Sequence, residues 1–169
     1  MLINEAIEKY FLAEKAESWI YMAIGIAAML VAFIAFFFLK TAFYKGAAIP
    51  LLLIGLLLGI AGFTVNKRSD GDRIRNVYAV SMNPGELKEK ELPRMEVVMK
   101  NFVVYRYFEI ALAILGFGLF FYFNNNQAQS FWKGVGIALA IMALLAVTAD
   151  YFAEKRGRIY LEQLNDFIQ

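Results

Sequence analysis

Two carboxylates, Glu109 and Asp150, interrupt otherwise apolar stretches of the sequence and are the first candidates for chemistry. Carboxylates inside a membrane are costly and often serve an ion or proton pathway. The alternative is structural, an interfacial ion pair with Arg68 or Arg106 as the partner that locks the two halves of the chain together. Both carboxylates lie within about one helical turn of a charged segment, where the cost of burial is small. This position favours a structural network of Arg68, Arg106, Glu109 and Asp150.

The residue types needed for most catalysis are missing. The chain has no Cys and no His, which excludes disulfides, thiol chemistry and the commonest general base and metal ligand. No phosphate-binding glycine loop is present, and the stretch from Asp70 to Asp72 lacks the later acidic ligands of a calcium loop. We therefore expect no catalytic residue, no cofactor and no metal site, and a protein that is not an enzyme.

Four apolar runs must position the charged residues. Hydrophobic residues fill 60% of the 169 positions, too large a share for a soluble domain of this length. Each run, alone or with the turn before it, is long enough for a helix that crosses the hydrocarbon core of a bilayer. The predicted spans are residues 19–39, 46–65, 107–123 and 131–152. The sequence thus predicts an all-α polytopic membrane protein, a single domain with four transmembrane helices arranged as two hairpins.

Small residues recur at helical spacing within these spans. Gly55, Gly59 and Gly62 form such a face in the second span, and the first two have the GxxxG spacing of closely packed membrane helices. Packing of this face against the first span is the simpler interpretation. A homodimer through Gly55 and Gly59 is the alternative.

Three segments outside the spans are predicted to form a small helical layer on one side of the membrane. Residues 1–18 read as an amphipathic helix, either separate from the first span or continuous with it. In the segment 66–106, Gly71 is expected to bend or break the chain, and Asn83 to cap the helix that follows. Residues 153–169 are predicted to form a final amphipathic helix.

The distribution of basic residues predicts the orientation of the chain. Fourteen of the 17 Lys and Arg residues lie before the first span, in the segment 66–106 or after the fourth span. The opposite side has only Lys40, Lys45 and Lys133. The positive-inside rule therefore places both termini and the segment 66–106 in the cytoplasm. The compact composition without cysteine indicates a bacterial inner membrane.

One apolar stripe in the segment 66–106 is a candidate docking surface for a partner. Met95, Met99 and Phe102 follow helical spacing, and Arg94 and Lys100 lie beside them. Methionine side chains adapt readily to different partner surfaces. The sequence therefore predicts that this stripe binds another protein, whereas the mixed charges around it are typical of solvated helix faces and not of nucleic-acid binding.

These observations favour a non-enzymatic membrane protein that acts by protein–protein binding. A bacterial immunity protein against a membrane-acting toxin is one form of this hypothesis, and an accessory subunit of a membrane complex is the other. The expected partners are membrane lipids and either the toxin or the other subunits of the membrane complex. The alternative is a small transporter or channel that works as a homo-oligomer, with flux through Glu109 and Asp150. An enzyme acting on lipid ranks last, because it would have only Asp, Glu, Lys and Tyr for its chemistry.

Overall fold

The computed structural model describes residues 3–169, which form helices joined by short turns. No strand occurs within these residues, and the prediction of an all-helical protein is confirmed. In chain order the elements are α1 (Ile3–Ile34), the π-helical turn η1 (Ala35–Leu39), α2 (Ala42–Met82), α3 (Pro84–Glu86), the π-helical turn η2 (Leu87–Glu91), α4 (Leu92–Tyr122), the 3-10 turn η3 (Gln127–Gln129) and α5 (Ser130–Ile168).

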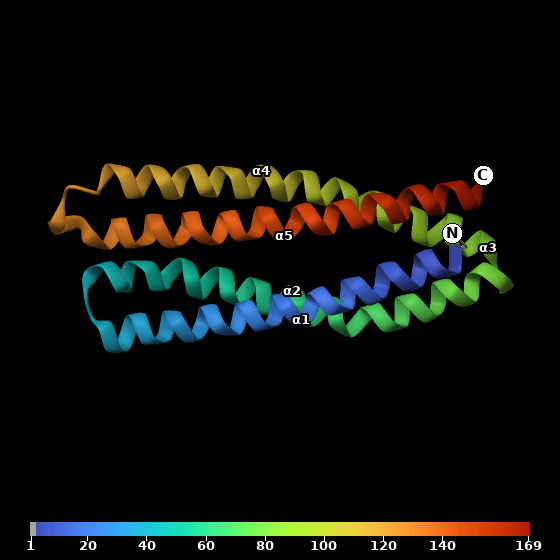
Figure 1. Cartoon of the computed structure of the whole chain (residues 1–169), viewed down its shortest axis with the longest axis horizontal. Coiled ribbons are helices and arrows are strands. Elements are labelled where there is room, and N and C mark those ends of the chain that lie inside the picture. The colour runs from blue at the N-terminus through green and yellow to red at the C-terminus, as the bar shows by residue number, and fades with distance from the viewer. Residues whose placement is uncertain (1–2) are drawn as a thin grey trace.

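The long helices run along one axis of an elongated molecule (Figure 1). α1 packs along α2, α4 packs along α5, and the largest contact between these two pairs is made by α2 and α5. The start of α1, the end of α5 and the connection through α3 lie at one end (Figure 1). The turn between α1 and α2 and the turn between α4 and α5 lie at the other end.

Four helical segments are long and apolar enough to cross a membrane. Each has between 37 and 42 residues, whereas about 20 residues suffice to cross the hydrocarbon core. The helices therefore continue well beyond their apolar runs. We call residues 19–65 and 107–152 the apolar half, and residues 3–18, 66–106 and 153–168 the charged end.

The helices are more continuous than the sequence predicts. Gly71 lies inside α2, so the predicted break there is wrong. A single glycine costs a helix only about 1 kcal/mol, and α2 contacts α1 on both sides of Gly71. The chain turns at Asn83, which occupies the cap position before Pro84 but makes no capping hydrogen bond with its side chain. The carboxylate of Glu86 accepts a hydrogen bond from Lys90 at 2.8 Å and does not complete a capping box.

Small residues set the spacing of the helices in the apolar half. A Cβ atom on Gly25 would lie 2.6 Å from the carbonyl oxygen of Gly55 and 2.8 Å from the backbone nitrogen of Gly59, so α1 and α2 touch through their backbones. A Cβ atom on Gly116 would lie 2.5 Å from the backbone nitrogen of Ala140, so α4 and α5 meet in the same way. The face of Gly55 and Gly59 is thus used within the chain and is not free for the homodimer contact considered above.

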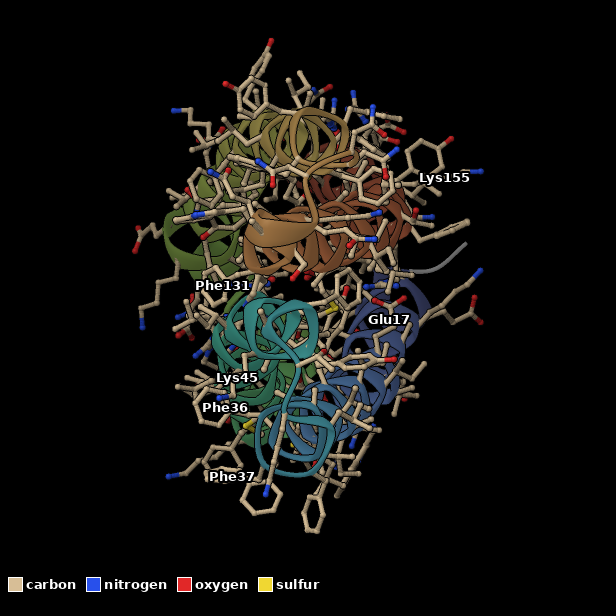
Figure 2. The ribbon with its side chains drawn as sticks, turned by 90° about the vertical axis from the view of Figure 1, so that its left-hand side faces the viewer. Glu17, Phe36, Phe37, Lys45, Phe131 and Lys155 are labelled. Carbon is tan, nitrogen blue, oxygen red and sulfur yellow. The ribbon has the colours of Figure 1, made fainter. Side chains whose placement is uncertain are left out.

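Two further glycines join the helix pairs near the outer turns. A Cβ atom on Gly46 of α2 would overlap the carbonyl oxygen of Phe131, and a Cβ atom on Gly134 of α5 would overlap that of Phe43. Phe131 lies between the ribbons of α5 and α2 in Figure 2. The large apolar side chains of this half, such as Phe37, instead point away from the ribbons (Figure 2). The apolar half therefore buries small residues and exposes large ones, as expected for helices surrounded by lipid.

The charged end has a denser core. Ile7, Phe11, Met95 and Tyr160 are buried in one cluster, and side chains of α2 pack against it. The rings of Tyr10 and Tyr160 stack with their centroids 4.4 Å apart. These contacts join all four long helices, so the charged end is one packed unit.

Candidate functional site

A cleft opens between the helices where the apolar half meets the charged end. Its volume is about 400 Å³, and all four long helices line it. We call it the interhelical cleft. Its lining includes Glu14, Glu17 and Tyr21 from α1, Val65 and Arg68 from α2, Asn101, Phe102 and Tyr105 from α4, and Asp150 and Arg156 from α5. The mixture of charged, aromatic and aliphatic groups distinguishes this cleft from the apolar hollows near the outer turns.

Two ion pairs hold α1 at the wall of the interhelical cleft. Arg68 donates a hydrogen bond to one oxygen of Glu14 at 2.9 Å, and the hydroxyl of Ser69 donates to the other oxygen at 2.9 Å. Arg156 forms a bidentate pair with Glu17. The first pair joins α1 to α2 and the second joins α1 to α5. Because these groups are partly buried, salt screens them less than it screens pairs on an open surface.

The predicted ion-pair network of Arg68, Arg106, Glu109 and Asp150 does not form. Arg68 pairs with α1 as described, and Arg106 pairs with Glu154. No ion pair within residues 3–169 includes Glu109 or Asp150. The reason lies in the helical register, since Glu154 follows Asp150 by one turn and Arg106 precedes Glu109 by about one turn. The arginine therefore pairs with the carboxylate on the side of the charged end.

Glu109 and Asp150 instead lie near one another between α4 and α5, and one buried carboxylate oxygen of Glu109 has no hydrogen-bond partner within residues 3–169. Two carboxyl groups this near each other repel when both are ionised. Asp150 also lines the interhelical cleft. The two residues thus form an acidic pair at the membrane end of the cleft.

The predicted docking stripe is largely an internal packing face. Met95 is 0% exposed and belongs to the core of the charged end, so it cannot bind a partner without unfolding. Met99 and Phe102 lie against α5, since a Cβ atom on Gly157 would be 3.3 Å from the sulfur of Met99 and 3.9 Å from the ring of Phe102. Only Lys100, of the residues predicted for this surface, is exposed. The apolar period of the sequence is correct, but it marks contact between α4 and α5.

Arg94, the remaining residue of that prediction, belongs to a buried polar group. Glu91 is 1% exposed and accepts hydrogen bonds from Arg94 at 2.7 and 2.9 Å and from the hydroxyl of Tyr160 at 3.1 Å. Burial lowers the pKa of Arg94, but the hydrogen bonds and charge of Glu91 outweigh it, so this pKa is raised above its ordinary value. Burial also raises the pKa of the Tyr160 hydroxyl. Both donors therefore keep the protons that satisfy the buried carboxylate.

The contribution of α1 to the interhelical cleft is missing from the sequence-based prediction. Tyr10, Glu14, Glu17 and Tyr21 follow one another at intervals of four, three and four residues, so they share one face of a helix. All four line the cleft. The spacing is a signal in the sequence, but acidic residues ahead of a span are also ordinary juxtamembrane charges. Only the positions of α2 and α5 show what this face contacts.

The interhelical cleft is lined by acidic, basic and aromatic side chains. Within residues 3–169, no group of three or more acidic side chains is arranged to hold a metal ion. The fold and the cleft together define a class: an all-helical protein with four helices able to cross a membrane and a polar cleft at one end of its apolar half. Comparison with known proteins finds no matching family model, no similar curated protein and no similar solved structure.

Proposed function

We propose that this chain is an integral membrane protein whose spans form two hairpins, with the charged end in the cytoplasm. Fourteen of the 17 Lys and Arg residues lie in the charged end, and cytoplasmic segments of membrane proteins carry such an excess. The charged end is then a packed cytoplasmic layer beneath four spans. A bacterial inner membrane fits the compact chain without cysteine.

We further propose that the protein acts by binding another protein and catalyses no reaction. An exposed apolar stripe on α2 carries this proposal. Ile74, Tyr78 and Met82 recur at every fourth residue and are 64%, 64% and 68% exposed. Ile74 lies nine residues beyond Val65, the end of the predicted second span, which is roughly 13 Å farther along the helix axis. Lipid chains do not reach this surface, so it is left to water or to a partner.

The partner that suits this α2 stripe is an amphipathic helix of another membrane-bound protein. Apolar residues one turn apart form a ridge that a second helix can cover with its own apolar face. Arg75 borders the stripe but already pairs with Asp72 at 3.1 Å, so the contact with a partner helix would be mainly apolar. The stripe follows the axis of α2 as the helix extends beyond the apolar half. This direction favours a partner helix that lies parallel or antiparallel to α2.

Two kinds of protein would use such a surface. One is a bacterial immunity protein, which neutralises a toxin that inserts into or crosses the inner membrane. The other is an accessory subunit that holds a larger membrane complex together. Both predict a tight complex with one specific partner, and gene neighbours separate them, because a toxin gene beside this gene favours the first and transport or secretion genes favour the second.

The test compares the wild type with a double variant of the stripe and a single control variant. Each protein is purified from the native host in mild detergent, together with whatever binds to it. Ile74→Gln with Tyr78→Gln removes two of the three residues of the α2 stripe, and Ile159→Gln removes an exposed apolar residue on α5. We expect one stoichiometric partner with the wild type and with the Ile159 variant, and its loss with the double variant. All three proteins should unfold at the same temperature, because the substituted side chains are exposed.

The proposal is wrong if the double variant retains the partner. It is also wrong if the wild type purifies only with itself. For the immunity form, cells that express the neighbouring toxin should survive with the wild type and die with the double variant at equal protein levels.

A second candidate function, transport, is favoured by the proximity of Glu109 and Asp150. A pair of neighbouring carboxyl groups beside a polar cleft is the kind of site that couples proton movement to a substrate. Glu109→Gln and Asp150→Asn should then each abolish proton flux across the membrane of proteoliposomes. Expression and melting temperature should stay unchanged in both variants. Flux that is absent in the wild type, or equal in both variants and the wild type, would exclude this function.

A further inference from the structure

A groove between α4 and α5 lies at the edge of the apolar half, where α5 enters the charged end. It has a volume of about 480 Å³ and is lined by Arg106, Val147, Tyr151, Glu154, Lys155 and Arg158. The interhelical cleft shares none of these residues. We call it the basic groove, because three of its six residues are cations and only one is an acid.

Glu154 leaves the basic groove with an excess of positive charge. This carboxylate is only 6% exposed, and it pairs with Arg106 and with Arg158, the latter at 2.8 Å. Each guanidinium uses one terminal nitrogen for this contact and keeps further N–H donors, since arginine has five. Lys155 makes no ion pair within the described part of the chain, and its side chain extends away from the ribbons in Figure 2.

The other wall of the basic groove is apolar and leads into the membrane. Val147, Tyr151, Lys155 and Arg158 lie at intervals of four, four and three residues, so they share one face of α5. Leu144 continues this face and is exposed. The groove therefore has cations toward the charged end and aliphatic or aromatic surface toward the bilayer, which is the polarity of a lipid with its headgroup at the membrane edge.

We propose that the basic groove binds the phosphate headgroup of an anionic phospholipid from the leaflet that borders the charged end. Lys155, Arg158 and the free donors of Arg106 hold the phosphate oxygens, and the acyl chain lies along Val147 and Tyr151. Arginine forks and lysine ammonium groups are the usual protein ligands of phosphate. The unequal charge of the groove favours anionic over zwitterionic headgroups.

This site rests on the proposed membrane insertion but not on the proposed binding of another protein. It requires only that the apolar half sits in a bilayer, and it holds for a docking protein and for a transporter. Loss of lipid binding would leave the α2 stripe untouched, because the stripe lies on a different helix and shares no residue with the groove.

The experiment is native mass spectrometry of the purified full chain with phosphatidylglycerol or phosphatidylcholine added to the detergent. We expect the wild type to retain phosphatidylglycerol in preference to phosphatidylcholine. Lys155→Ala and Arg158→Ala should each weaken phosphatidylglycerol binding about fivefold, the effect of about 1 kcal/mol per membrane-surface cation. Glu154 keeps Arg106 as its partner in both variants, so the fold should be preserved, and equal melting temperatures check this.

Lys67→Ala is the matched control. Lys67 is an exposed cation that follows the second predicted span and lies outside the basic groove, so its removal should leave lipid retention unchanged. Equal binding of both lipids overturns the proposal, as does an equal loss with Lys67→Ala. Glycerol 3-phosphate serves as a probe without acyl chains. If it competes as strongly as the lipid, the groove is a soluble phosphate site and the lipid assignment is wrong.

Discussion

The charged end and the apolar half belong to the same helices, yet they are held together by opposite means. The charged end joins helices with large side chains in exact pairings, such as the stacked rings of Tyr10 and Tyr160 and the hydrogen bonds to buried Glu91. The apolar half joins them where side chains are absent, as at Gly25 and Gly134. A single helix can pack in both ways because its surroundings change from water to lipid along its length.

The difference follows from what surrounds each region. Water drives the burial of Ile7, Phe11 and Met95 in the charged end, since apolar surface exposed there would be costly. Lipid supplies no such drive in the apolar half, so helices associate where backbones can approach closely. The charged end should therefore be sensitive to the loss of polar partners, and the apolar half to the addition of volume.

Glu91→Ala should have the largest effect, and it acts on the charged end. The substitution leaves the partly buried Arg94 and the buried Tyr160 hydroxyl without their acceptor, and breaking a buried ion pair costs about 3–5 kcal/mol. We expect the free energy of unfolding in SDS mixed micelles to fall by that amount. Glu86→Ala, which removes the exposed pair with Lys90, is the control and should change stability little.

Replacing both Glu91 and Arg94 with apolar residues tests whether the loss of stability in Glu91→Ala comes from an unpaired buried charge. The double variant Glu91→Leu with Arg94→Leu removes both charges, so it should recover a large part of the stability that Glu91→Ala loses. If the double variant is as unstable as the single one, then the ion pair itself is not what stabilises the charged end.

Gly134→Val should have the next largest effect, and it acts on the apolar half. The new side chain would overlap the carbonyl oxygen of Phe43 and force α5 away from α2. Overpacking of this kind costs about 3 kcal/mol, measured by the same unfolding titration. Gly118→Val is the matched control, because nothing lies within 4 Å of a Cβ atom at that position. Equal losses in the two variants would mean that backbone contact does not determine the packing of this half.

The sequence predicts the apolar half better than it predicts the charged end. Hydropathy identifies four helices able to cross a membrane, and the spacing of Gly55 and Gly59 favours the contact within the chain that the structure has. Hydropathy and glycine spacing are both properties of a short stretch of chain, so they can be recognised in a single sequence.

The charged end is harder to predict because its contacts depend on partners far apart in the chain. Met95 has the spacing of an exposed stripe or of a packed face, and only the position of α5 shows that it is buried. Arg106 has three possible carboxylate partners nearby, and helical register selects Glu154. Gly71 signals a break, but the helix is continuous there and ion pairs join it to α1 on both sides of Gly71.

A pH titration tests the charged end more gently than these substitutions. Burial, with the nearby charge of Glu14, raises the pKa of Tyr10 to about 12, whereas a tyrosine in an unfolded chain has a pKa of about 10. A raised folded-state pKa stabilises the protein fully below pH 10, and this contribution is lost as the pH rises through 12. Between pH 9 and pH 12 the wild type should therefore lose up to about 2 kcal/mol more stability than Tyr10→Phe. Tyr78→Phe, which removes an exposed hydroxyl, should follow the wild type, and a Tyr10→Phe curve identical to both would show that the Tyr10 hydroxyl is open to water.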